Sequence, residues 1–133
     1  MSTAAAPKQV SPRTGIFPAV SSFEFMTKEV GRTVTVAVAG ELDLDSHGRL
    51  EEELRRVEEL RPPVLVLDLR ELEFMDSTGL RLVVGADSRA REEGRRLVVV
   101  RGGEAVSRVF RITRMDERFE MVDEPPPEES PGG

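Results

Sequence analysis

Two short apolar runs constrain the fold of this chain more than any other feature of its sequence. Residues 64–69 are Val-Leu-Val-Leu-Asp-Leu, and residues 97–100 are Leu-Val-Val-Val. Nearly continuous aliphatic runs of this length are typical of central strands that are covered on both faces. The segment between them repeats apolar residues at helical spacing, at Leu82, Val83, Ala86 and Ala90. A strand, a helix and another strand in this order predict two parallel strands joined by a helical crossover.

The segment before this unit predicts two more strands. Apolar and β-branched residues are concentrated at positions 23–25 and 33–38. A turn between them is expected near residues 29–32, where Gly31 can adopt positive φ. We expect the second of these strands to end at Gly40. Together they predict an antiparallel pair at the start of the sheet.

Two further helices are predicted from apolar residues at helical spacing. The first begins at Asp45 or Ser46, either of which is a good N-cap, and it ends before Pro62, because proline removes a backbone donor. The last helix follows Gly102-Gly103 and precedes a short closing strand at residues 119–122. The apolar faces of the two helices consist of Leu50, Leu54, Val57, Val106, Val109 and Phe110.

The length of 133 residues fits one domain with a tail at each end. The elements predict an α/β domain over residues 21–123, with a mixed sheet of four to five strands and helices packed on it. Residues 1–20 are rich in Ala, Ser, Thr and Pro without apolar periodicity, so we predict a disordered tail. Residues 124–133 combine acidic residues with three consecutive prolines and are predicted to form a second disordered tail.

The composition excludes several classes of function. The formal net charge of −6 disfavours nucleic acid and anionic membranes as partners, because both require a basic surface. The chain has no cysteine and its carboxylates are dispersed, so we predict no metal site and no cofactor. No apolar run approaches the length of a membrane span, and the N-terminus lacks the apolar core of a secretory signal. We therefore expect a cytoplasmic protein.

The segment Met75-Asp76-Ser77-Thr78-Gly79 is the most informative motif, because it lies where a strand is predicted to lead into a helix. Free backbone N–H groups and the helix dipole favour negative charge at such a position. A phosphate on Ser77 would be tolerated there, and it would add roughly −1.5 to −2 charge units. A simpler interpretation is that Asp76 or Ser77 only caps the helix and that Gly79 only permits close packing. The local pattern leaves both interpretations open.

Several motifs at matching spacing resemble the anti-sigma factor antagonist family of STAS domains, over roughly residues 22–123. They are Gly40-Glu41-Leu42-Asp43, Leu65-Val66-Leu67-Asp68-Leu69, the segment from Phe74 to Leu80, and Leu97-Val98-Val99-Val100. The resemblance implies that Ser77 is the phosphoacceptor. It also implies that the unmodified protein binds an anti-sigma factor with a histidine-kinase-like ATPase fold and thereby frees the sigma factor. That partner, holding ATP and magnesium, would phosphorylate Ser77 and end binding, and a metal-dependent serine phosphatase would reverse the change.

The resemblance further implies a partner-binding surface around Ser77. Asp43 is included because the family places its Gly-Glu-Leu-Asp segment close to the phosphoacceptor. The other predicted members are Asp76, Thr78, Gly79 and Leu80. Thr78 is also the rival phosphoacceptor. Leu80 and Val84 lie off the main helical stripe, so they either form an apolar contact patch or are buried by the sheet.

The sequence departs from the family pattern near the end of the domain. Many relatives have glycine after the last helix, whereas this chain has Arg114 before Met115-Asp116. Because arginine adopts the left-handed conformation less readily than glycine, we expect this helix end to have a different shape.

An enzymatic function is not predicted. Serine hydrolysis requires a base such as histidine beside the nucleophile, and the only histidine, His47, falls in the early turn of the first helix, where we expect it to be exposed. The remaining alternative is a STAS module without a switch, either a scaffold subunit of a signalling assembly or a part of a lipid-transport complex. A serine at position 77 beside Asp76 favours the switch. The free protein is expected to be a monomer.

Overall fold

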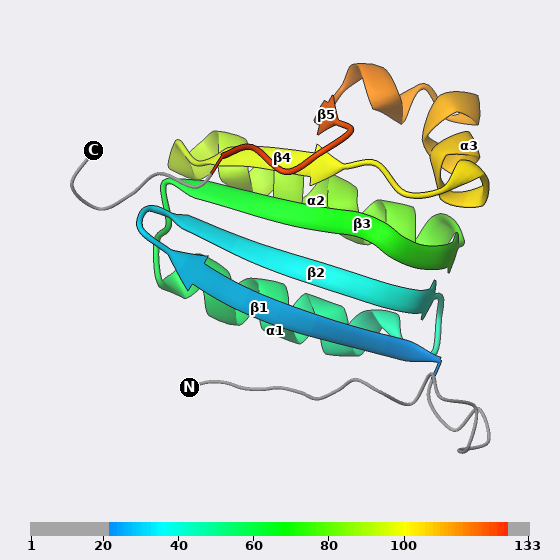
Figure 1. Cartoon of the computed structure of the whole chain (residues 1–133), viewed down its shortest axis with the longest axis horizontal. Helices are drawn as coiled ribbons and strands as arrows, with labels where there is room; N and C mark the ends of the chain where they lie inside the picture. The colour runs from blue at the N-terminus through cyan, green and yellow to red at the C-terminus, as the bar shows by residue number, and fades with distance from the viewer. Residues whose placement is uncertain (1–21, 128–133) are drawn as a thin grey trace.

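Five strands form one sheet in the order in which they occur in the chain, β1-β2-β3-β4-β5 (Figure 1). The computed structural model describes residues 22–127. The strands are β1 Phe23–Val30, β2 Thr33–Leu42, β3 Val64–Met75, β4 Arg96–Val100 and β5 Glu120–Val122. β1 pairs with β2 in antiparallel orientation, and the later neighbours pair in parallel. The predicted α/β class and mixed sheet are therefore confirmed.

Three α-helices follow the strands of the parallel part of the sheet. They are α1 His47–Glu59, α2 Ser77–Glu93 and α3 Glu104–Ile112, and a short 3₁₀ helix, η3 Met115–Glu117, precedes β5. α1 and α2 lie side by side on the same face of the sheet (Figure 1). The main core lies between this face and the helices, and all three α-helices contribute to it through residues such as Leu50, Val83 and Phe110.

A second, smaller apolar cluster lies on the opposite face of the sheet. Strand alternation directs Val66, Val98 and Val100 to this face, and none of them is more than 1% exposed. The partly buried Val64 and Val122 pack against them. β3 and β4 are thus buried on both faces, as their continuous apolar runs predict.

The second strand extends beyond Gly40, where the sequence predicted its end. Gly40 has φ 93°, and the pairing of β2 with β3 shifts register at this position. A Cβ atom at Gly40 would lie 1.6 Å from Ser22 O, so the close approach of the preceding chain requires glycine. The glycine bends the strand rather than ending it, and β2 continues to Leu42.

The ends of the helices follow local chemistry. α2 stops where Gly94 adopts the left-handed conformation (φ 72°), as predicted. Arg114, after α3, also adopts this conformation, with φ 62°. The expectation that this helix end has a different shape is therefore wrong, because position 114 still adopts the left-handed conformation. The arginine side chain makes this conformation less favourable by roughly 1–2 kcal/mol.

The predicted tails are covered only in part. Residues 1–20 and 128–133 lie outside the described residues, so the prediction for them stays a prediction. Residues 124–127, which were assigned to the second tail, are described. They follow Asp123, whose carboxylate lies 2.9 Å from Arg101 Nη1.

Candidate functional site

The end of β3 and the start of α2 define the candidate site. Asp76 joins them in an extended conformation, and its Oδ1 accepts hydrogen bonds from Thr78 N at 2.9 Å and Gly79 N at 3.2 Å. Asp76 is therefore the N-cap, one of the two capping residues that the sequence left open. Ser77 is the first residue of α2 and is exposed. Its hydroxyl can be modified without loss of the cap.

Gly79 and Leu80 are buried beneath this exposed first turn. A Cβ atom at Gly79 would lie 2.6 Å from Met75 Cγ and 2.9 Å from Leu42 Cγ, so α2 approaches the strand ends this closely only because position 79 lacks a side chain. Leu80 is 9% exposed and belongs to the core. Val84 is partly buried against the same core.

Of the two alternatives for Leu80 and Val84, burial by the sheet holds for Leu80, and Val84 is partly buried. Residues three and four positions apart lie on the same side of a helix, and Leu80 shares its side with Val83, which is fully buried on the sheet. The wide apolar face of α2 covers the core, and none of it is left for a partner at position 80. Gly79 and Leu80 hold the site in place from beneath.

The loop after β2 brings Asp43 to the same edge of the sheet. β2 and β3 run parallel, Leu42 is in register with Met75, and Asp76 N donates to Leu42 O at 3.2 Å. Asp43 Oδ1 accepts hydrogen bonds from two N–H groups of its own loop at 3.0 and 3.1 Å and from Ser46 Oγ at 3.1 Å. The carboxylate of Asp43 thus shapes the loop, in addition to any contact it makes with a partner.

Two exposed apolar side chains near Ser77 were missed by sequence reasoning. Leu44 is 69% exposed in the loop after Asp43, and Phe74 is 46% exposed near the end of β3. For Phe74 the signal was strand alternation: Met75 is buried, so Phe74 must face the other way. Aromatic side chains such as that of Phe74 are enriched in protein–protein interfaces.

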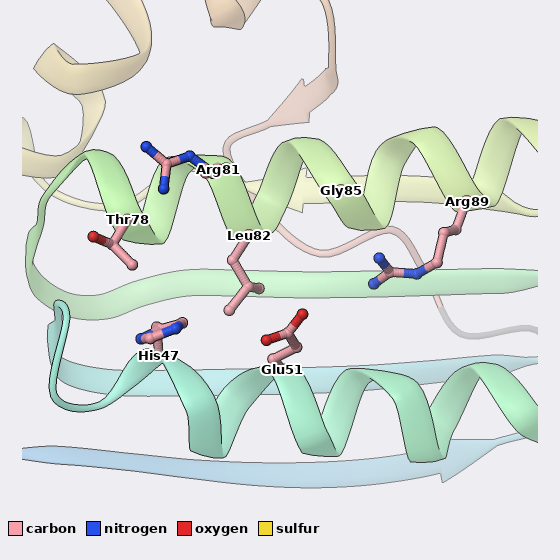
Figure 2. A pocket seen from close by; sticks show the side chains of 7 residues that line it. All are labelled: His47, Glu51, Thr78, Arg81, Leu82, Gly85 and Arg89. Atoms are coloured by element: carbon pink, nitrogen blue, oxygen red, sulfur yellow. The ribbon is translucent and has the colours of Figure 1, made fainter.

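A groove of about 180 Å³ runs between α1 and α2 from the candidate site (Figure 2). Its lining residues are His47, Glu51, Thr78, Arg81, Leu82, Gly85 and Arg89. His47, which was expected to be exposed, is partly buried, because Leu44 O in the preceding loop lies 2.8 Å from its Nδ1. The groove therefore presents a histidine and an arginine beside Thr78.

Comparison with known proteins identifies the family. The family model described as Mlab, STAS domain, matches residues 25–123. The chain belongs to the STAS domain family. Its similarity to the anti-sigma-B factor antagonist of Listeria monocytogenes is 33% identity over 88 residues, which cover 66% of this chain and 77% of that protein.

Two more relatives support the same placement of this STAS domain. The anti-sigma-F factor antagonist RsfB of Mycobacterium tuberculosis is 31% identical over 98 residues, covering 67% of this chain and 80% of that protein. The crystal structure of an anti-sigma factor antagonist from Mycobacterium paratuberculosis superposes with a TM-score of 0.70 at 28% identity. The superposition covers 81% of this chain and 92% of the mycobacterial chain. These relatives are regulatory proteins.

The STAS domain gathers part of the predicted site at one edge of its sheet. Asp43, Asp76, Ser77 and Thr78 come together there, whereas Gly79 and Leu80 are buried below them. Within residues 22–127, no group of three or more His, Cys, Asp or Glu side chains is arranged to hold a metal ion. In the same span, no helix is both long and apolar enough to cross a bilayer.

Proposed function

We propose that this STAS domain is an anti-sigma factor antagonist whose partner binding is switched off by phosphorylation of Ser77. The observation that carries the proposal is the exposure of Ser77 at the first position of α2, while Asp76 provides the cap. A phosphate there leaves the cap and the core unchanged. It adds roughly −1.5 to −2 charge units to a surface that already contains Asp43 and Asp76.

The partner that we propose is an anti-sigma factor with a histidine-kinase-like ATPase fold. The relatives in Listeria and Mycobacterium are themselves anti-sigma factor antagonists. Leu44 and Phe74 offer apolar contact area near Ser77. The unmodified domain binds the partner through this surface, and the partner releases its sigma factor. With ATP and magnesium, the partner then phosphorylates Ser77, and the new charge repels it until a serine phosphatase removes the phosphate.

In this cycle the STAS domain is a substrate, and the catalytic groups belong to the kinase and the phosphatase. We propose that it acts in the cytoplasm as a monomer. Its net charge of −6 supports a protein partner rather than nucleic acid or an anionic membrane.

Incubation of the purified chain with its cognate anti-sigma factor, ATP and magnesium tests the proposal. We expect a mass gain of one phosphate, located on Ser77 by peptide mapping, and loss of the complex in a pull-down. Ser77→Ala should gain no phosphate and should still bind. Thr78→Ala removes the rival acceptor and should still gain one phosphate, on Ser77.

Two outcomes would contradict the proposal. Phosphate on Thr78 of the wild type would identify the rival acceptor. A stable complex that gains no phosphate would favour the alternative, a STAS scaffold or lipid-transport subunit without a switch.

A further inference from the structure

Three backbone amides in the first turn of α2 already have acceptors. Asp76 Oδ1 accepts from Thr78 N and Gly79 N, and Leu80 N donates to Asp76 O at 3.1 Å. A phosphate on Ser77 cannot use these amides unless it displaces the cap. A cationic side chain can therefore add stabilising charge for a phosphate at this position beyond that of the helix dipole.

Arg81 is the cation on α2 that has no carboxylate partner within residues 22–127. The other two arginines of this helix are paired: Arg89 Nε lies 2.7 Å from Glu58 Oε1, and Arg91 Nε lies 2.8 Å from Asp87 Oδ2. Arg81 is exposed. Figure 2 shows its guanidinium extended towards the end of the helix where Thr78 lies. This direction is the usual one, because helical side chains tilt towards the N-terminus.

The spacing of Ser77 and Arg81 suits a phosphate. Residues four apart on a helix face each other with Cβ atoms about 5–6 Å apart, and an anion placed N-terminal to a cation is the favourable order. An arginine fork binds phosphate oxygens in a bidentate arrangement.

The groove supplies the other charges that face this position. His47 lies across the groove on α1, and Glu51, one turn further along α1, is the opposing carboxylate. Glu51 has a long contact of its own with Arg55, at 3.9 Å. On the strand side, Asp43 and Asp76 are both held by hydrogen bonds of their own loops. Arg89 also lines the groove but is paired with Glu58. Among residues 22–127, Arg81 is thus the arginine of the groove that has no carboxylate partner.

We propose that Arg81 is a positioning residue that binds the phosphate of modified Ser77 and holds it against the mouth of the groove between α1 and α2. This inference rests on the proposed function for the modification itself. Its consequence is a competition: in the unmodified domain Arg81 is available to a carboxylate of the partner, and the phosphate removes it from the partner-binding surface. The switch then includes the loss of an attractive group as well as the gain of a repelling one.

The test uses the full chain with phosphoserine incorporated at position 77 during translation, so that no kinase is needed. The titration of the phosphate is followed by ³¹P NMR in the wild type and in Arg81→Gln. Arg108→Gln is the control, because Arg108 is an exposed arginine on α3 with only a 3.9 Å contact to Glu104. His47, which also lines the groove, is present in all three proteins and so cannot account for a difference between them.

We expect the phosphate of the wild type and of Arg108→Gln to lose its second proton at lower pH than that of Arg81→Gln, because a nearby cation favours the dianion. A broad-specificity phosphatase should remove the phosphate roughly twofold faster from Arg81→Gln, in line with the modest strength of i,i+4 ion pairs. Equal titration curves in the wild type and Arg81→Gln would overturn the inference. Because the partner is absent, that result leaves the proposed function standing, whereas a kinase that fails to modify Ser77 would overturn the function alone.

Discussion

The two ends of α2 use their charged side chains in different ways. At the C-terminal half, Arg89 makes a bidentate pair with Glu58 of α1, and Asp87 accepts from both Arg91 and Arg118. At the N-terminal end, Arg81 has no carboxylate partner among the described residues, and Ser77 is exposed. One end therefore joins elements of the fold, and the other leaves its polar groups available to ligands.

Burial explains why the paired end matters for stability. The side chains of Glu58 and Asp87 are 7% and 8% exposed, whereas most ion pairs elsewhere in the domain involve two well-exposed groups. A buried carboxylate that loses its partner keeps the cost of desolvation, while an exposed one is compensated by water. The comparison predicts that substitutions at the two ends separate stability from binding.

The largest expected effect is on stability at the C-terminal half of α2. Glu58→Ala should lower the free energy of unfolding by about 3 kcal/mol, because Arg89, 20% exposed, loses both of its hydrogen bonds. Urea denaturation measures this change. Glu59→Ala, at the exposed neighbouring position, is the control and should change stability by less than about 0.5 kcal/mol. Equal losses in the two variants would show that the Glu58–Arg89 pair does not join the helices as described.

The next effect is on binding at the N-terminal end. Ser77→Asp should weaken the complex with the anti-sigma factor by about tenfold or more, which corresponds to about 1.4 kcal/mol. The melting temperature should stay nearly unchanged, since an anion is tolerated in the first turn of a helix. Calorimetry of binding and of thermal unfolding measures both quantities. Binding as tight as that of the wild type would rule out charge repulsion at this site.

A smaller loss of stability is expected from the cap. Asp76→Ala should cost about 1 kcal/mol, because Thr78 N and Gly79 N lose their acceptor. Asp45→Ala, an exposed aspartate in the nearby loop, serves as the matched control in the same denaturation assay. If the two variants were equally stable, Asp76 would be dispensable as a cap, and the amides would be free for a phosphate.

The smallest effect concerns a pair on α1 in which the arginine is exposed and the carboxylate is largely buried. Hydrogen bonding to Arg56 lowers the pKa of Glu53 below its usual value, against the opposing effect of burial. A carboxylate with a lowered pKa in the folded state stabilises the fold above its unfolded pKa, and this contribution disappears as the pH falls through the folded pKa. Glu53→Gln should therefore cost less than about 1 kcal/mol at pH 7 and almost nothing at pH 3. Urea denaturation at both pH values measures the loss in the free energy of unfolding, with Glu52→Gln as the control. A loss that is the same at pH 3 and pH 7 would show that the ion pair with Arg56 is not its cause.

Much of the fold was predictable because its signals are local. Three of these signals depend on residues close together in the chain. They are the apolar runs of β3 and β4, the helical stripe at Leu82, Val83, Ala86 and Ala90, and the helix stop at Gly94. The position of Ser77 at the start of a helix was predictable for the same reason. The bend at Gly40 was not, because the contact that requires glycine comes from Ser22, the residue just before the other strand of the hairpin.

The surface around Ser77 was predictable only in part. Leu80 and Leu44 are both leucines beside polar residues, and nothing in the neighbouring sequence distinguishes a buried leucine from an exposed one. One is buried and the other is 69% exposed, because the packing of α2 on the sheet covers position 80 and leaves the loop at position 44 uncovered.

The sequence by itself determined the alternation of strands and helices, the parallel crossover and the position of the serine at a helix start, since periodicity and capping act within a few residues. Only the tertiary structure decided which charges are paired. Arg81 and Arg89 look alike along α2, but the partner of Arg89 is Glu58, 31 residues earlier on a neighbouring helix. Partners so distant in the chain are determined by the packing of whole elements, and among the described residues 22–127 that packing leaves Arg81 without a carboxylate partner.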